Sequence, residues 1–390
     1  MNKTQVLTLN NISVTGLKRL PLDVYEIGSE MPNPDAVLLR SFKMHDWVIP
    51  DSLQCVGRAG AGTNNIPIEK MTAKGIPVFN APGANANAVK ELVIIGMLMS
   101  ARNIFPACEF ARDLIGDDAS ITKQVEAGKK NYVGFELPNH TLGVVGLGAI
   151  GVKIANAAIA LGMRVIGFDP AITVKSAWQL SHKVEQASSI SDLLNQSNFV
   201  TFHVPLIDAT KNMINTLSLA SMLDNVTVLN FARQGIIDDE AVVAALDSGK
   251  VNAYVCDFPS NLLKNHPKVI ALPHLGASTV EAEDNCAIMV ADEIKDYLEN
   301  GNVTNSVNFP EMVMSRSAGE YRLAIANSNV PNMIGQISSA IAKADINIID
   351  MNNKSRGDLA YTLVDTSAKL PQTVVDELCA IEGVLSLRVL

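Results

Sequence analysis

The sequence predicts an α/β protein with two Rossmann-like, doubly wound parallel-sheet domains and a C-terminal ferredoxin-like βαββαβ domain. The chain has 390 residues, 48% of them hydrophobic and 18% charged, which is enough for two or three domains with substantial cores. Its middle alternates short apolar strands with helical segments, a pattern typical of a parallel sheet covered on both faces. From residue 321 onward the pattern changes to strand, helix, strand, strand, helix, strand.

The predicted domain bounds follow these patterns. The first predicted domain is discontinuous and covers residues 1–101 and 280–310, and its second part begins with a helix over 280–299 that ends at Asn300-Gly301. Residues 102–279 form the second domain, 311–319 a linker, and 320–390 the C-terminal domain. The expected strands of the second domain cover 142–145, 164–168, 199–203, 227–230, 253–256 and 269–272.

Composition excludes several classes of protein. The net charge of −9 disfavours a nucleic-acid binder. The N-terminus lacks the basic and apolar regions of a signal peptide, and the longest apolar run, 92–99, is too short to cross a bilayer. The five cysteines include no C-x-x-C pair, so we expect reduced thiols, a cytoplasmic location and no metal site.

A glycine pattern predicts a dinucleotide site. Gly146, Gly148 and Gly151 form G-x-G-x-x-G directly after a strand and at the start of a helix. In this pattern Gly146 permits the tight turn, Gly148 lets the backbone approach the pyrophosphate, and Gly151 lets helix and strand pack closely. The helix N-terminus then offers amide donors and a positive dipole end to the phosphates.

Asp169 indicates which dinucleotide binds. It ends the next strand, 18 residues beyond Gly151. A carboxylate there accepts hydrogen bonds from the ribose hydroxyls and repels a 2′-phosphate, and no arginine follows it closely. The cofactor is therefore expected to be NAD rather than NADP.

Polar residues after three other strands are candidates for the chemistry. Hydride transfer from a 2-hydroxy acid needs a base for the hydroxyl proton and a cation for the carboxylate. Arg233 follows the strand at 227–230, Asp257 the strand at 253–256, and His274 the strand at 269–272. A guanidinium suits a carboxylate, and an imidazole titrates near neutral pH. His203 also ends a strand, so position alone does not exclude it.

Three segments together resemble the D-2-hydroxyacid dehydrogenase family: residues 146–151, 230–238 and 273–279. The His-Leu-Gly-Ala-Ser-Thr run from His274, the Asn-Ser-Val-Asn-Phe run at 305–309 and the small C-terminal domain resemble its phosphoglycerate dehydrogenase branch. The resemblance implies NAD-dependent oxidation of D-3-phosphoglycerate to 3-phosphohydroxypyruvate, the first step of L-serine biosynthesis. It also implies that Arg233 orients the carboxylate and that His274 is the acid/base.

The same resemblance assigns further contacts. Asp257 corresponds to the family aspartate near the nicotinamide carboxamide. The implied cofactor residues are Gly146, Gly148, Ala149, Ile150, Gly151, Asp169, Val204, Phe231, Ala232, Asp257, Gly276 and Ala277. The implied substrate residues are Arg40, Lys43, Arg58, Gly60, Ala61, Asn80 and Arg233. In the family, a lysine of a neighbouring subunit can also contact the substrate, and Lys129 or Lys130 would match it.

One position departs from the family pattern. The family usually has a glutamate five residues after the position of Asp257, where it pairs with the catalytic histidine. This chain has Leu262 there, and no acid occurs between Asp257 and Glu281. Either another carboxylate reaches His274, or the histidine works without a charged partner.

The C-terminal domain resembles an ACT domain, which binds amino acids between two copies. Asn329 and Asn347 match positions at which related enzymes hold serine, and the candidate Asn327 stands where the family often has histidine. L-serine is therefore the expected effector of a homo-oligomer, a dimer or tetramer. A purely assembling role stays open. Two other functions also stay open: turnover of another 2-hydroxy acid, such as glycerate or 2-hydroxyglutarate, and an NAD-sensing corepressor.

Overall fold

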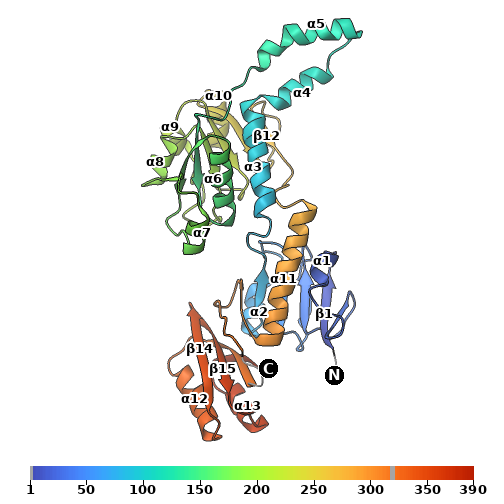
Figure 1. Ribbon diagram of the computed structural model, residues 1–390, viewed down its shortest axis with the longest axis vertical. Helices are drawn as coiled ribbons and strands as arrows, with labels where there is room; N and C mark the ends of the chain where they lie inside the picture. The colour runs from blue at the N-terminus through green and yellow to red at the C-terminus, as the bar shows by residue number, and fades with distance from the viewer. Residues whose placement is uncertain (1–2, 317–320) are drawn as a thin grey trace. The chain divides into compact units, whose positions relative to one another are not determined.

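The computed structural model describes residues 3–316 and 321–390 (Figure 1). The chain divides into two compact units. The first unit comprises Met1–Ala84 and Glu283–Leu390, and the second comprises Asn85–Ala282. We describe each unit separately.

The second unit contains a seven-stranded sheet in the order β12-β11-β10-β9-β6-β7-β8, in which every strand pair is parallel. Its strands are rich in Val, Ile, Leu and Phe, as expected for a sheet buried on both faces. Their bounds are β6 Thr141–Val145, β7 Arg164–Phe168, β8 Glu185–Gln186, β9 Phe199–Phe202, β10 Val226–Asn230, β11 Val251–Cys256 and β12 Val269–Ala271.

Helices cover this sheet. They are α3 Ala86–Ala101, α6 Ala149–Ala160, α7 Val174–Gln179, α8 Ile190–Leu194, α9 Thr216–Ser221 and α10 Asp239–Asp247. Helix α3 packs on α6, β10 and β11. Gly96 allows this close approach, since a Cβ there would lie 3.0 Å from Val255 and 3.2 Å from Leu229. The second unit therefore begins at residue 85, whereas the sequence had suggested 102.

A helical segment projects from this unit (Figure 1). It consists of α4 Ile104–Arg112, α5 Asp118–Gly128 and the 3₁₀ turn η1 Lys129–Tyr132, and none of its residues is buried. Several apolar side chains in and around it are exposed instead: Phe105, Ile115 and Val133. Such exposed apolar groups on one segment are typical of an interaction surface.

The first unit contains a five-stranded parallel sheet in the order β2-β1-β3-β4-β5. Its elements are β1 Thr4–Leu9, α1 Val14–Leu17, β2 Tyr25–Gly28, β3 Ala36–Leu39, β4 Cys55–Arg58, α2 Ile68–Ala73, β5 Val78–Asn80 and the long helix α11 Val280–Asn300. Gly57 of β4 lies directly under α11, because a Cβ there would come within 2.3 Å of Val290 and 2.6 Å of Ile294.

The C-terminal part of the first unit is an antiparallel sheet in the order β14-β15-β13-β16. Its elements are β13 Tyr321–Ser328, α12 Met333–Lys343, β14 Ile348–Arg356, β15 Leu359–Thr366, α13 Gln372–Cys379 and β16 Val384–Val389. This confirms the predicted βαββαβ order. Side chains alternate between two cores, as the two-residue period of a strand requires. Leu323 and Ile325 pack with α12 and α13, whereas Ala324 and Ala326 belong to the core around α11.

The predicted linker is not a free tether over its described part. Met312 and Val303 exchange backbone hydrogen bonds of 2.7 and 2.8 Å, and Met314 N donates to Asn302 Oδ1 at 3.1 Å. Met312 and Met314 are buried. Residues 317–319 of the predicted linker lie outside the described residues.

Over the described residues, no single helix is long and apolar enough to span a membrane. Helices α3 and α4 reach the required length and composition only as a pair, and they are bent by 66° at the break between them.

Candidate active site

The carboxyl ends of the second unit's parallel strands lie in one row. The register pairs Val145 with both Phe168 and Phe202, Asn230 with both Phe202 and Cys256, and Cys256 with Ala271. The residues that follow these positions therefore emerge at one edge of the sheet, the edge at which open α/β sheets bind ligands. The glycine loop, Asp169, Arg233, Asp257 and His274 all follow strands there.

The glycine loop has the geometry that the sequence pattern predicts. Gly146 has φ +91°, and Cβ atoms at Gly146 and Gly151 would lie 2.5 Å from His203 O and 1.9 Å from Gly146 O. Both positions therefore require glycine. A Cβ at Gly148, the N-cap of α6, would meet no described atom within 4 Å. This open space in front of a helix N-terminus fits the pyrophosphate of a dinucleotide.

Asp169 holds the glycine loop from the neighbouring strand. Its Oδ2 accepts from Leu147 N at 2.8 Å, and its Oδ1 accepts from Ala171 N at 2.9 Å. A carboxylate has about four acceptor sites, so both oxygens retain capacity for ribose hydroxyls. Sequence reasoning predicted the ribose contact but not this support of the loop.

Arg233 lies on a turn that Asn230 fixes. Asn230, buried at the end of β10, donates from Nδ2 to Arg233 O at 2.9 Å and accepts at Oδ1 from Ala232 N at 3.2 Å. The exposed Arg233 side chain donates once, from Nη1 to Ala232 O at 2.7 Å. Its other N–H groups have no partner within the described chain, so they can form a bidentate contact with a carboxylate.

His274 is held in an unusual backbone conformation. Its φ is +50°, in the left-handed region that residues other than glycine rarely adopt. His274 N donates to Leu272 O at 3.0 Å and to Asp257 O at 3.1 Å. The imidazole itself is exposed and lies edge-on to the Phe258 ring, with 5.1 Å between centroids. Backbone strain of this kind is frequent at functional sites.

Asp257 is the buried carboxylate of this edge. Its Oδ2 accepts from Gly276 N at 3.3 Å, and its Oδ1 has no partner among the described residues. Burial raises the pKa of the Asp257 carboxyl, and the charges of His274 and Arg233 partly offset that rise. An orphaned acceptor at this depth suits a donor such as the carboxamide of a nicotinamide.

At the position where the family usually has a glutamate, this chain has an apolar side chain that is exposed. Leu262 is 46% exposed, and no carboxylate in the described chain forms an ion pair with His274. Instead His274 contacts the ring of Phe258, a residue that sequence reasoning did not select. Asp257 accepts from His274 N through its backbone carbonyl, and its carboxylate acts on the imidazole through its charge.

His203, which the sequence left as an alternative base, is disfavoured by its surroundings. Its Nε2 bonds Thr201 Oγ1 at 2.8 Å, and its Nδ1 is buried without a described partner. Burial lowers the pKa of His203 to about 3, so the ring stays neutral at physiological pH.

The remaining predicted cofactor residues occupy the same edge. Phe231, Ala232 and Gly276 are buried there, and Val204 and Ala277 are half-buried. Ala149 and Ile150 form the first turn of α6.

The predicted substrate residues lie at the corresponding edge of the first unit's sheet. The register pairs Leu39 with Arg58 and Arg58 with Asn80, so Arg40, Arg58 and Asn80 come from three adjacent strand ends. Arg58 Nε donates to Arg40 O at 3.1 Å, and Asn80 Nδ2 donates to Ala61 O at 2.5 Å. These hydrogen bonds join the three strand ends to one another and to the loop that contains Gly60 and Ala61.

Gly60 shapes this loop. It has φ +151°, and a Cβ there would lie 2.3 Å from Arg58 Nη1. Lys43 is exposed. Arg40 forms an ion pair with Glu283 of α11 at 2.6 Å, so a substrate anion has to compete with a carboxylate for this cation.

A buried carboxylic acid stabilises the substrate-side loop through a neighbouring asparagine. Asn305 O accepts from Asn80 N at 3.4 Å, and Asn305 Nδ2 donates to Glu293 Oε1 at 2.6 Å. Glu293 Oε2 is buried with no partner in the described structure. Burial raises the pKa of the Glu293 carboxyl to about 8. The neutral acid is therefore the favoured form at neutral pH.

Glu293→Gln is expected to stabilise the protein in a pH-dependent way. The pKa of Glu293 is about 8 in the fold against 4.5 as a free side chain. The wild type therefore loses stability relative to the variant as pH rises from about 4.5 to about 8. Melting temperatures of both proteins should coincide near the lower pH and differ by several degrees near the upper one. Glu311→Gln, at an exposed site, is the control, and a pH-independent difference would contradict the assignment.

The predicted effector asparagines divide between two places. Asn327 and Asn329 line a small pocket, together with Ser328, Val330, Asn332, Met333, Ile334, Asn353 and Ala360. Asn347 lies elsewhere on the domain, beyond the C-terminus of α12, where its backbone bonds Ser367. One chain therefore does not bring all three together. Within the described residues, no cluster of three or more His, Cys, Asp or Glu side chains is arranged to hold a metal ion.

The chain is similar in sequence to known proteins over most of its length. The family model described as "D-isomer specific 2-hydroxyacid dehydrogenase, NAD binding domain" matches residues 104–276. The D-3-phosphoglycerate dehydrogenase of Methanocaldococcus jannaschii is 36% identical over 338 residues, 84% of this chain and 61% of that protein. The enzyme of the same name from Haemophilus influenzae is 31% identical over 350 residues, 87% of this chain and 81% of that protein.

Solved structures show the same fold. The NAD⁺-bound 3-phosphoglycerate dehydrogenase of Entamoeba histolytica aligns with a TM-score of 0.60 and 25% identity, covering 79% of this chain and 99% of that one. The D-mandelate dehydrogenase of Rhodotorula graminis aligns with a TM-score of 0.67 and 22% identity, covering 81% of this chain and all of that one.

Proposed function

Because the chain belongs to the D-isomer specific 2-hydroxyacid dehydrogenase family, we propose that it oxidises D-3-phosphoglycerate to 3-phosphohydroxypyruvate with NAD. The observation that carries this proposal is the placement of Arg233, Asp257 and His274 at the same sheet edge as the glycine loop. A cation, a buried acceptor and a titratable imidazole beside a dinucleotide loop are the groups that hydride transfer from a hydroxy acid requires.

The cofactor site fits NAD. The open space at Gly148 and the N-terminus of α6 would receive the pyrophosphate, Asp169 the ribose, and the unpaired Oδ1 of Asp257 the carboxamide. Bound there, NAD supplies the acceptor for the hydride that leaves C2 of the substrate.

The chain's own residues supply the rest of the mechanism. Arg233 holds the substrate carboxylate through two parallel N–H···O bonds and so fixes the orientation of C2. His274 takes the hydroxyl proton as the carbonyl forms, and its imidazolium then faces the negative charge of Asp257. Phe258 limits rotation of the ring by edge contact.

The substrate assignment is tested by a panel of hydroxy acids. NADH formation is measured with D-3-phosphoglycerate, D-glycerate and D-2-hydroxyglutarate, each with NAD and with NADP. The proposal expects the highest kcat/KM with D-3-phosphoglycerate and NAD. Another 2-hydroxy acid is the second candidate, because Arg40 is already paired with Glu283. NAD binding without turnover of any of these acids would favour an NAD sensor and overturn the proposal.

Asp169→Ala is expected to raise the KM for NAD by about ten- to a hundredfold, the effect of losing charge-assisted hydrogen bonds. It should also narrow the preference for NAD over NADP, because the carboxylate that repels a 2′-phosphate is gone. Steady-state kinetics with both cofactors measure this. Asp224→Ala, which removes a surface ion pair with Lys250 in the same unit, is the control. A wild type that prefers NADP would contradict the role of Asp169.

We infer that the protein is a homo-oligomer that assembles through the α4–α5 segment, whose residues are not buried within one chain. Light scattering should show loss of the oligomer in Phe105→Asp and not in Val174→Asp, an exposed apolar site on α7. In such an assembly Lys129 or Lys130 is the candidate cation for a neighbouring active site. All five cysteines are unpaired, which supports a cytoplasmic location.

We further propose L-serine as an effector of the C-terminal domain. Asn327 and Asn329 would line its pocket in one subunit, and Asn347 would reach it from another. Calorimetry should detect binding of L-serine and not of D-serine to the full chain, and Asn329→Ala should weaken it. If L-serine does not bind the intact protein, the domain has an assembling role.

A further inference from the structure

The C-terminal end of α11 is completed by side chains from outside the helix. The last four carbonyls of a helix lack intrahelical partners, and basic side chains normally compensate for them. Helix α11 has no basic residue in its last turn. Gly301, with φ +72°, ends the helix, and its N–H donates to Tyr297 O at 2.9 Å.

Three arginines take over these carbonyls. Arg388 of β16 donates from Nη1 to Tyr297 O and from Nη2 to Leu298 O, both at 2.9 Å. Its guanidinium also lies 4.4 Å from the centre of the Tyr297 ring. Arg316 donates to Glu299 O and Arg322 of β13 donates to Asn300 O, both at 3.0 Å. Tyr361 of β15 adds a bond from its hydroxyl to Gly301 O at 2.9 Å.

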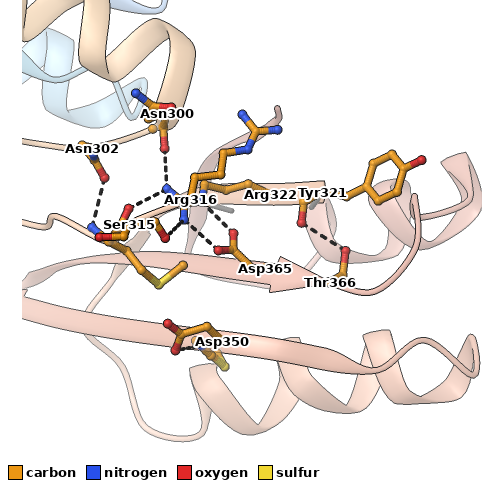
Figure 2. A network of polar contacts seen from close by, with 12 residues as sticks. Asn300, Asn302, Ser315, Arg316, Tyr321, Arg322, Asp350, Asp365 and Thr366 are labelled. Carbon is orange, nitrogen blue, oxygen red and sulfur yellow. Dashed lines mark hydrogen bonds and ion pairs between the residues drawn. The ribbon is translucent and has the colours of Figure 1, made fainter. Parts of the chain in front are cut away.

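Arg322 is the centre of this arrangement (Figure 2). Its side chain is 0% exposed, and it forms a bidentate ion pair with Asp365 through Nε at 2.6 Å and Nη2 at 2.7 Å. The remaining donors bond Asn300 O, Met314 O and Ser315 O at 2.8–3.0 Å. All five N–H groups of the guanidinium are therefore used, which is the condition under which a buried arginine is stable.

The apolar contacts agree with the polar ones. Ala324, Ala326, Tyr361 and Leu363 of the C-terminal sheet share one core with Phe79, Tyr297 and Phe309 of the rest of the unit. The centroids of the Tyr361 and Phe309 rings lie 6.3 Å apart. The small side chains of Ala324 and Ala326 allow the sheet to approach closely.

We propose that Arg322 and Arg388 are positioning residues for the substrate-binding unit: the C-terminal domain caps α11 and holds it against β4. Helix α11 lies on Gly57, next to Arg58, and its Glu283 pairs with Arg40. Loosening its last turn should therefore disturb both arginines. This inference rests on the proposed function, in which Arg40 and Arg58 bind the substrate.

The test compares Arg388→Met, which keeps the aliphatic stem but loses the donors, with Lys343→Met, which breaks the exposed ion pair to Glu377 in the same domain. Hydrogen exchange of a peptide covering 295–303 should become about tenfold faster in Arg388→Met, the effect of losing a hydrogen bond from a charged donor. The KM for D-3-phosphoglycerate should rise while that for NAD stays unchanged. Lys343→Met should alter neither quantity.

A second variant covers the case in which Arg388→Met is too mild. Arg322→Met combined with Asp365→Leu removes both buried charges together, so no charge is left unpaired. Unchanged exchange at 295–303 in both altered proteins would overturn the capping role. Faster exchange with an unchanged KM for the hydroxy acid would overturn the positioning role. The exchange measurement needs no turnover, so a failure of the proposed activity would be recognised separately.

Discussion

His274→Ala is expected to lower kcat for D-3-phosphoglycerate by about 10²- to 10⁴-fold, the contribution of a positioned general base. The imidazole is exposed at the strand edge, and its backbone is fixed by two hydrogen bonds to Asp257 and Leu272. Alanine keeps the backbone donor and removes only the ring. The KM for NAD should change little, because no cofactor contact is assigned to this ring.

The controls separate the ring's chemistry from its place in the fold. His182→Ala removes an exposed histidine of the same unit and should leave kcat unchanged. The pH profile of kcat/KM in the wild type should show a group that must be neutral for oxidation. Turnover of His274→Ala at the wild-type rate would exclude His274 as the acid/base and return attention to His203.

Most strands of the second unit could be predicted because their apolar runs end at a turn-forming residue: glycine after β6, aspartate after β7 and β11, and asparagine at the end of β10. Segment 164–168 coincides with β7, and the glycine loop begins directly after β6 as expected. The short edge strand β8 was missed, because its two exposed residues, Glu185 and Gln186, carry no apolar signal. Pairing with Ile166 and Gly167 creates that strand.

The sequence of α3 does not show to which of the two units this helix belongs. Its residues are apolar on several faces, and its packing on α6, β10 and β11, closest at Gly96 with Leu229 and Val255, shows which sheet it covers. Tertiary packing of this kind has no local signature.

The site residues that directly follow a strand could be predicted, whereas contacts between segments that are distant in the sequence could not. Arg233, Asp257 and His274 follow strands directly, so their common edge could be inferred. The contact of Phe258 with His274 depends on the left-handed backbone at His274, which no pattern indicates.

Two further features escaped prediction because their partners lie far apart in the chain. Glu293 and Asn305 support the substrate-side loop from α11, and Arg388 reaches the end of the same helix from β16. From the sequence alone, each of these charged residues would be interpreted as a solvated surface group. Only burial in the fold shows that it is a structural contact.

Arg233→Lys is expected to lower kcat/KM for D-3-phosphoglycerate by about 10²-fold, although the positive charge is kept. A lysine offers a point charge and no planar fork, so it cannot hold a carboxylate through two parallel bonds. The substrate then rotates away from the geometry in which C2 faces the hydride acceptor, and misplacement of about 1 Å has an effect of this size.

The turn at Asn230 makes this prediction specific. The Asn230 side chain holds the turn through two backbone atoms, Arg233 O and Ala232 N, so lysine at position 233 leaves the turn intact. Melting temperature and the KM for NAD should therefore match the wild type, while both kcat and the KM for the hydroxy acid worsen. Arg164→Lys, at an exposed ion pair with Glu185, should leave all of these quantities unchanged. If Arg233→Lys retains the wild-type kcat/KM, the carboxylate is held by another cation, and Arg40 or Arg58 becomes the first to test.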